Sequence, residues 1–170
     1  MAGVSSQFFH YFKDNYEYIH RLPETECYLI KLYLNGITEC DVAKMCGRTQ
    51  ASVSHRFRKA WKRIEFMKVI DSFDLVDFEK DLKEVCNVKE IEIAKHMIRT
   101  TSQTQTAVLI QKQFKKRTTQ VMVKHRFEKC IKKLKETNKP KFNNYLELLE
   151  MVRKNLYVLS EVKLPRWSKL

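Results

Sequence analysis

The sequence predicts an all-α protein organised around two helix-turn-helix modules, and an internal repeat carries this prediction. The segment Thr49–Ile64 returns seventy residues later as Thr119–Leu134. In both copies apolar residues recur at i, i+4, i+7 and i+11, which places them on one face of an α-helix with polar, basic outer faces. A threonine able to cap the helix begins each copy. Eight positions are identical at this separation: Thr49/Thr119, Gln50/Gln120, Val53/Val123, His55/His125, Arg56/Arg126, Phe57/Phe127, Lys59/Lys129 and Lys62/Lys132.

Two shorter helices are expected before the first basic helix. A break at an Asn-Gly pair ends the first of them, Glu24–Leu34. Thr38 can cap the second, Glu39–Met45, and Gly47 supplies the backbone freedom for a tight turn into the basic helix. A short helix, a turn and a longer basic helix form a helix-turn-helix arrangement.

The second module matches the first less regularly in its upstream part. Glu90 aligns with Glu26 at a separation of 64 and Thr106 with Thr38 at 68, whereas the basic helices align at 70. We therefore expect both loops of the second module to be longer than those of the first. Residues 114–117 stand at its turn and include no glycine, so a standard three-residue turn is not expected there.

Further helices are expected on either side of the modules. The N-terminal stretch carries a stripe of Phe8, Phe12, Tyr16 and Ile19 at helical spacing, and this pattern favours core packing over base stacking. The expected helices are an N-terminal one capped by Ser5 or Ser6 and running to about His20, an acidic one over Asp71–Cys86, and a C-terminal one capped by Asn143 or Asn144 and running to about Leu156.

The tail that follows contains Leu159, Val162, Leu164 and Trp167, for which docking on the body is favoured over binding a partner. The resulting segments are 1–68 (N-terminal helix and first module), 69–86 (connecting acidic helix), 87–138 (second module) and 139–170 (C-terminal helix and tail).

The charge of the chain favours a polyanionic partner. Lys and Arg number 33 against 20 acidic residues, which gives a formal charge of +13. The excess is clustered, because Gln111–Lys135 holds ten cations and one acid. Nucleic acid is the first candidate and an anionic membrane surface the second. No membrane span or signal peptide is visible, so we expect a cytoplasmic, nucleoid-associated protein.

No constellation of residues predicts catalysis or metal binding. The chain lacks a glycine-rich phosphate loop, H-E-x-x-H and G-x-S-x-G, and its histidines are isolated from nucleophiles and metal ligands. We expect no enzyme, no cofactor and no metal. The five cysteines include no CxxC pair and are expected to be reduced, three of them at core positions: Cys27, Cys46 and Cys130.

Leu22–Ile64 resembles region 4 of bacterial sigma factors, especially the extracytoplasmic-function type, and more loosely LuxR-type DNA-binding domains. The resemblance implies promoter recognition with the second helix of the motif in the major groove, and contact with RNA polymerase. It covers about a quarter of the chain, and no region 2 pattern accompanies it. The resembling features are Leu22-Pro23, Leu34-Asn35-Gly36-Ile37-Thr38, Asp41-Val42-Ala43, Cys46-Gly47 and Val53–Ile64.

The helical wheel assigns the outward residues of each basic helix to DNA. Gln can bond adenine and Arg can bond guanine, whereas flanking cations suit phosphates. Arg56 has an alternative role as a partner of Glu24 or Glu26, and Arg126 as a partner of Glu90. Predicted base contacts are Gln50, Ala51, Ser54, His55, Arg58, Gln120, Val121, Lys124 and His125, with Glu128 as a further candidate. Predicted phosphate contacts are Arg48, Arg56, Lys59, Lys62, Arg63, Arg117, Arg126, Lys129, Lys132 and Lys133.

The leading hypothesis is a transcription regulator, encoded by a phage or mobile element, that binds specific sequences of double-stranded DNA through tandem modules. One alternative is a protein that binds RNA polymerase or a sigma factor, with only non-specific DNA binding. Another is a component of a phage packaging or replication machine. Tandem modules would allow binding as a monomer, and a homodimer is the other possibility.

Overall fold

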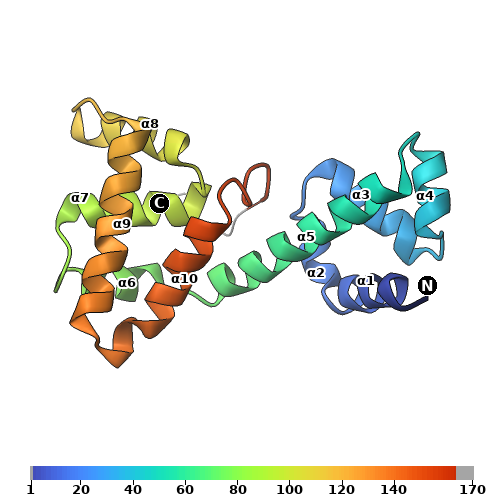
Figure 1. Ribbon diagram of the computed structural model, residues 1–170, viewed down its shortest axis with the longest axis horizontal. Coiled ribbons are helices and arrows are strands. Elements are labelled where there is room, and N and C mark those ends of the chain that lie inside the picture. The colour runs from blue at the N-terminus through green and yellow to red at the C-terminus, as the bar shows by residue number, and fades with distance from the viewer. Residues whose placement is uncertain (1, 164–170) are drawn as a thin grey trace. The chain divides into compact units, whose positions relative to one another are not determined.

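A computed structural model describes residues 2–163, which are all-α and include no strand. They divide into two compact units (Figure 1). The first comprises the described residues up to Asp71 together with 161–163, and the second comprises 72–160. The predicted all-α fold class is confirmed.

The first unit packs around the buried face of its longest helix. Phe57 lies at the centre, with ring centroids 5.6 Å from Phe8, 5.4 Å from Phe12 and 5.0 Å from Tyr33. Truncating a core phenylalanine to alanine costs about 3–5 kcal/mol, so this cluster is a large part of the unit's stability. Its helices are α1 (Ala2–Asp14), α2 (Tyr16–Ile19), α3 (Glu24–Leu34), α4 (Glu39–Met45) and α5 (Gln50–Asp71).

The bounds of α3 and α4 match the predicted ones at both ends, because a glycine follows each helix and local signals mark where each begins. Gly36 and Gly47 adopt positive φ of 88° and 62° just after these helices. After α4, the Gly47 N–H donates to the Lys44 carbonyl (3.2 Å) and the Arg48 N–H to that of Ala43 (2.8 Å), a glycine-dependent helix ending. Thr38 caps α4 as predicted, accepting the Asp41 N–H at 3.2 Å.

The N-terminal region differs from the prediction. α1 begins at Ala2, so neither Ser5 nor Ser6 is its cap, and it ends at Asp14 instead of continuing to about His20. Asn15 interrupts it, donating its side-chain amide to the Tyr11 carbonyl at 2.8 Å. The break rotates Tyr16 out of the aromatic stripe, and Tyr16 is exposed.

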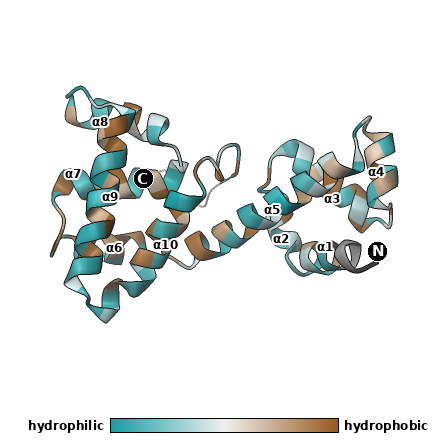
Figure 2. Ribbon diagram, in the orientation of Figure 1, coloured by the Kyte–Doolittle hydropathy of each residue, from teal (hydrophilic) through white to brown (hydrophobic). Residues whose placement is uncertain are grey.

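The second unit is built from six helical segments. Its core is aliphatic around Ile93 and Met97, with aromatic packing between Phe78 and Tyr145, whose ring centroids lie 5.3 Å apart. In Figure 2, hydrophobic and hydrophilic residues alternate along α9 as in an amphipathic helix. The segments are α6 (Leu75–Leu82), α7 (Val88–Thr100), α8 (Gln103–Phe114), α9 (Gln120–Thr137), η1 (Pro140–Phe142) and α10 (Asn143–Lys154).

The expected connecting segment 69–86 is not a separate element. α5 continues to Asp71, and the acidic helix is the shorter α6, capped by Asp74 and packed into the second unit through Phe78 and Leu82. α10 belongs to the same unit, and no side chain caps it, since Asn143 is already its first residue.

The tail returns to contact both cores. Leu159 is buried, and its N–H donates to the Thr101 hydroxyl of the second unit at 3.0 Å. Val162 packs against the core of the first unit, where the Lys163 N–H donates to the Arg21 carbonyl at 2.9 Å. Docking is thus confirmed for these residues, whereas Leu164 and Trp167 lie outside the described residues.

Candidate nucleic-acid interface

The two units contain corresponding sets of three helices. Every buried residue of α3 has a buried counterpart in α7 at a separation of 64. The caps Thr38 of α4 and Ser102 of α8 share this separation. The predicted match of Glu90 with Glu26 is therefore confirmed, whereas Thr106 does not correspond to Thr38. The pairs of α3 and α7 are Glu26/Glu90, Leu29/Ile93, Ile30/Ala94 and Tyr33/Met97.

Corresponding residues of the two units are 64 apart in the first helix of each set and 70 apart in the basic helix. The six additional residues lie in the second helix and in the turn that follows it. α8 has 12 residues against 7 in α4, and the turn to the next helix has five residues (115–119) against four (46–49). The differences of five and one sum to the six extra residues. The first loop, by contrast, shortens from four residues (35–38) to two (101–102), so the expectation that both loops lengthen is wrong.

The turn of the second unit needs no glycine because Lys115 takes its place. Lys115 adopts φ 52° after α8, close to the 62° of Gly47 after α4. A left-handed backbone costs a non-glycine residue about 1–2 kcal/mol, so the surrounding structure holds Lys115 in a strained conformation. The next helix then starts alike in both units, with the Thr49 hydroxyl accepting the Ser52 N–H (3.1 Å) and Thr119 that of Met122 (3.3 Å).

Two buried ion pairs hold the basic helices in place. Arg63 of α5 bonds Glu26, with side chains 3% and 1% exposed. At the equivalent position of α9, Lys133 Nζ lies 2.7 Å from Glu90 Oε2, with side chains 30% and 0% exposed. Glu90 also completes a capping box by accepting the Asn87 N–H at 3.0 Å. Burial raises the pKa of Glu90, but the bonds from Lys133 and Asn87 outweigh it and leave that pKa below its usual value.

These pairs correct two predicted phosphate contacts and the alternative roles of Arg56 and Arg126 as ion-pair partners. Arg63 is in the core, so its assignment to phosphate is wrong. The Lys133 ammonium is engaged by Glu90, and we remove it from the interface as well. Glu26 and Glu90 pair with Arg63 and Lys133, which lie two helical turns after Arg56 and Arg126. Arg56 and Arg126 themselves have no ion-pair partner in the part of the chain that the structure describes.

The outer face of α5 is basic and free of acids over residues 50–64. Gln50, Ala51, His55 and Arg58 are exposed, and no acidic residue occurs before Glu65. Ser54 is only partly exposed, because its hydroxyl donates to the Glu39 carboxylate of α4 at 2.6 Å, and it is therefore less available to a ligand. Among the described residues, the following cations of this face form no ion pair: Arg48, Arg56, Arg58, Lys59 and Lys62.

The outer face of α9 combines cations with exposed apolar residues. Val121 is 74% exposed at the first turn, next to the half-exposed Met122, where α5 has Ala51 and Ser52. Gln120 is exposed and makes only long contacts of 3.4 Å to Gln103 and Thr104. Other exposed residues are Lys124, His125, Glu128, Lys129 and Lys132, the last of which lies 3.7 Å from Glu136.

A basic groove of about 950 Å³ is lined by α8, by the turn that follows it and by the first residue of α9. Its lining includes Thr118 and Gln120 and no acidic side chain. Its four cations, which come from the end of α8 and the strained turn, are Lys112, Lys115, Lys116 and Arg117. Arg117, which the sequence predicts to contact phosphate, thus lies in a group of four cations, and no role is predicted from the sequence for the other three.

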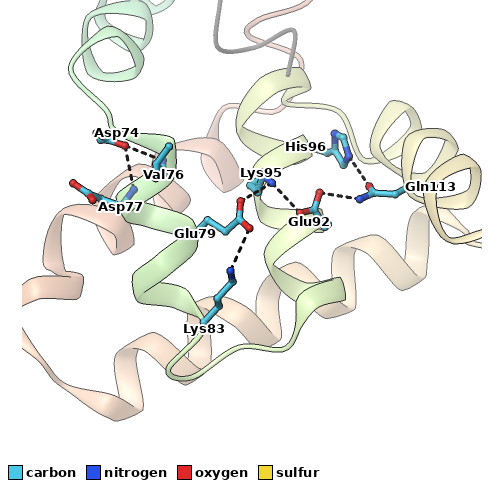
Figure 3. A network of polar contacts seen from close by, with 9 residues as sticks. All are labelled: Asp74, Val76, Asp77, Glu79, Lys83, Glu92, Lys95, His96 and Gln113. Carbon is cyan, nitrogen blue, oxygen red and sulfur yellow. Dashed lines mark hydrogen bonds and ion pairs between the residues drawn. The ribbon is translucent and has the colours of Figure 1, made fainter.

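A polar network ties α6, α7 and α8 together (Figure 3). Lys95 Nζ donates to Glu79 of α6 at 2.9 Å and to Glu92 of α7 at 2.8 Å. Gln113 of α8 donates to Glu92 (3.1 Å) and contacts His96 Nε2 (3.2 Å). Burial lowers the pKa of His96 more than the Gln113 bond raises it. The network thus ties α8, which lines the basic groove, to α6 and α7.

The described residues contain no group of three or more His, Cys, Asp or Glu arranged to hold a metal ion. No described helix combines the length and hydrophobicity needed to cross a bilayer. Comparison with protein-family models, curated proteins and solved structures finds no match to this chain. The arguments about function therefore depend on the geometry and charge described above.

Proposed function

We propose that this protein binds double-stranded DNA through two helix-turn-helix modules, α3–α5 and α7–α9, and regulates transcription by doing so. The observation that carries the proposal is the outer face of α5 over residues 50–64, which contains no acidic residue. Structural ion pairs use Glu26 and Glu90 for Arg63 and Lys133, yet the outward cations of α5 form no ion pair among the described residues. A surface of unpaired cations on a capped helix suits a phosphate backbone.

Each basic helix is assigned to a major groove. Its buried face is held by the core, and its first turn presents Gln50 in one unit and Gln120 in the other. Gln bonds adenine bidentately, and each good pair gives about 1–3 kcal/mol of discrimination. Arg58 can bond guanine, and the exposed Val121 suits the methyl group of thymine. The two modules therefore read different chemistry.

The number of phosphate contacts gives a quantitative expectation. With Arg63 and Lys133 removed, eight of the predicted contacts remain: Arg48, Arg56, Lys59, Lys62, Arg117, Arg126, Lys129 and Lys132. Eight contacts predict that log K falls against log salt with a slope of about −7. A much shallower slope would mean that only one module engages DNA.

Selection of bound duplexes from a random library at near-physiological salt tests the proposal. Two enriched half-sites, about 10 bp apart or a multiple of this spacing, would support tandem readout by one chain. One enriched half-site would assign base reading to a single module. Salt-sensitive binding without enrichment would refute a specific regulator, and an absence of binding would refute DNA as the partner.

The apolar surface of the second unit favours one alternative, in which that unit binds RNA polymerase or another protein. Val108 is 64% exposed and Val121 74% exposed on adjacent helices, and exposed apolar residues of this kind occur at protein interfaces. Pull-down of RNA polymerase by the full chain, compared with a Val108→Ser/Val121→Ser variant, tests this role. Equal capture by both proteins would exclude this surface.

A further inference from the structure

Two thiols face each other inside the second unit. The Sγ atoms of Cys86 and Cys130 lie 3.3 Å apart, and both residues are buried and free of a disulfide. Cys86 lies in the segment between α6 and α7, directly before the capping Asn87, whereas Cys130 is in the middle of the buried face of α9. The contact therefore joins the start of the three-helix set to its basic helix.

Packing alone does not require sulfur at this place. The residue of the first unit that corresponds to Cys130 is Ala60, which is equally buried on α5. A small apolar side chain thus suffices on this face of the helix. The pairing of two thiols is a property of the second unit alone, since Cys27, Cys40 and Cys46 of the first unit have no thiol contact among the described residues.

We propose that Cys86 and Cys130 form a redox-active dithiol that a peroxide oxidises to an intramolecular disulfide. The sulfur atoms need to approach by only about 1.2 Å to reach the bonded distance of about 2.05 Å. The hydrogen bond between the thiols orients one sulfur toward the other. The disulfide would add a covalent modification to the second unit.

The surroundings of the pair make Cys86 the first site of attack. The hydrogen bond from Cys130 lowers the pKa of Cys86 and outweighs burial and Glu90, which raise it, while Lys133 also acts to lower it. The same hydrogen bond raises the pKa of Cys130, and burial raises it further. Cys86 is also the more accessible of the two, at 7% exposure against 0%. A thiolate is the reactive form of cysteine, so oxidation begins at Cys86.

The reaction balances with one peroxide per pair. The Cys86 sulfur attacks one peroxide oxygen, the O–O bond breaks, and one water leaves once the second oxygen takes up a proton. The resulting sulfenic acid is attacked by the Cys130 sulfur, the S–O bond breaks, and a second water leaves as the disulfide forms. Two electrons pass from the two thiols to the peroxide, and a dithiol reductant reverses the change.

The disulfide would tie α9 to the segment before α7. It closes a loop between residues 44 apart, which contains the whole of α7 and α8. Closing a loop of this length restricts the unfolded chain, and we expect the Tm of the second unit to rise by roughly 10 °C or more.

Hydrogen peroxide treatment of the full chain, carried in a Cys40→Ser background, tests the site. This background removes the exposed thiol most able to link two chains. After denaturation and alkylation, we expect two of the four remaining thiols to be protected and a linked peptide to join Cys86 to Cys130. Dithiothreitol should restore full alkylation.

Cys130→Ala is the matched control because the first unit folds with alanine at this position. This variant lacks the hydrogen bond that lowers the pKa of Cys86, so its oxidation should be slower and should stop at a Cys86 sulfenic acid, which dimedone traps, whereas the parent protein should give no adduct there. Full alkylation of the parent after peroxide treatment would overturn the proposal. Protection of any pair other than Cys86 and Cys130 would overturn it equally.

Discussion

Two neighbouring cations of α5 are expected to affect different properties, Lys62 the binding of DNA and Arg63 the stability of the first unit. Lys62 is exposed and unpaired among the described residues, whereas Arg63 is buried against Glu26. We expect Lys62→Met to leave stability within about 0.5 kcal/mol and to weaken DNA binding. Arg63→Met should do the reverse, because it leaves the Glu26 carboxylate buried without its cation.

The cost follows from the environment of Glu26. Its side chain is 1% exposed, and its Oε2 has no hydrogen-bond partner, so Arg63 supplies its main compensation. Removing one member of a buried pair costs about 3–5 kcal/mol. With a slope of about 1.5 kcal/mol per M, this loss lowers the urea midpoint of the first unit by about 2–3 M.

Tryptophan fluorescence measures this midpoint in one unit only. The chain has two tryptophans, so Trp167→Phe leaves Trp61 of α5 as the sole reporter. Trp61 stacks on Tyr11 at a centroid distance of 3.8 Å, and unfolding must break that contact. A loss below 1 kcal/mol for Arg63→Met would refute the buried ion pair.

Binding is compared in variants that stay folded. Glu26→Met/Arg63→Met removes both charges, and apolar replacement of a whole buried pair is often neutral or stabilising. The salt slope of this double variant should equal that of the parent, whereas Lys62→Met should reduce the slope by about one. A reduced slope in the double variant would place Arg63 back at the interface.

Three further predictions concern the second unit. Lys115→Gly should stabilise it by about 1 kcal/mol in urea unfolding by releasing the strain of φ 52°, whereas Lys116→Gly, at a residue without positive φ, should not stabilise it. Because burial lowers the pKa of His96, the unfolded chain binds the proton more tightly, so stability should fall as pH drops below about 6.5. His96→Gln should reduce the difference between the free energies of unfolding measured at pH 7.5 and at pH 5.5. An unchanged difference would show that His96 does not cause this pH dependence. Replacing thymine by deoxyuridine in a selected half-site should weaken binding of the parent protein, and a Val121→Ser variant that kept the full difference would rule out methyl recognition by Val121.

The sequence predicts helices best where local chemistry determines them. α3 and α4 match their predicted bounds because a glycine follows each and Thr38 caps α4. The break at Asn15 escaped prediction because the aromatic stripe continues through it, and the rotation at the break shows only in three dimensions. The exposure of Tyr16 follows from this local break.

The sequence predicts those site residues whose exposure follows from the amphipathic pattern of a helix. The outward positions of α5 and α9 follow from helical periodicity, and most of them are exposed. Arg63 was misplaced because a cation at the edge of a polar face is normally solvated, and its burial depends on Glu26, 37 residues earlier. The thiol pair was missed for the same reason, since 44 residues separate Cys86 from Cys130.

The return of residues 161–163 to the first unit has a consequence for biosynthesis. During translation, residues up to Asp71 emerge and can collapse around Phe57 well before Val162 and Lys163 exist. The bond from Arg21 Nε to the Lys163 carbonyl, at 2.9 Å, therefore forms only after the whole second unit has left the ribosome. The first unit is therefore completed only after the second unit has been synthesised, and until then the apolar surface beneath Val162 is uncovered and open to chaperones.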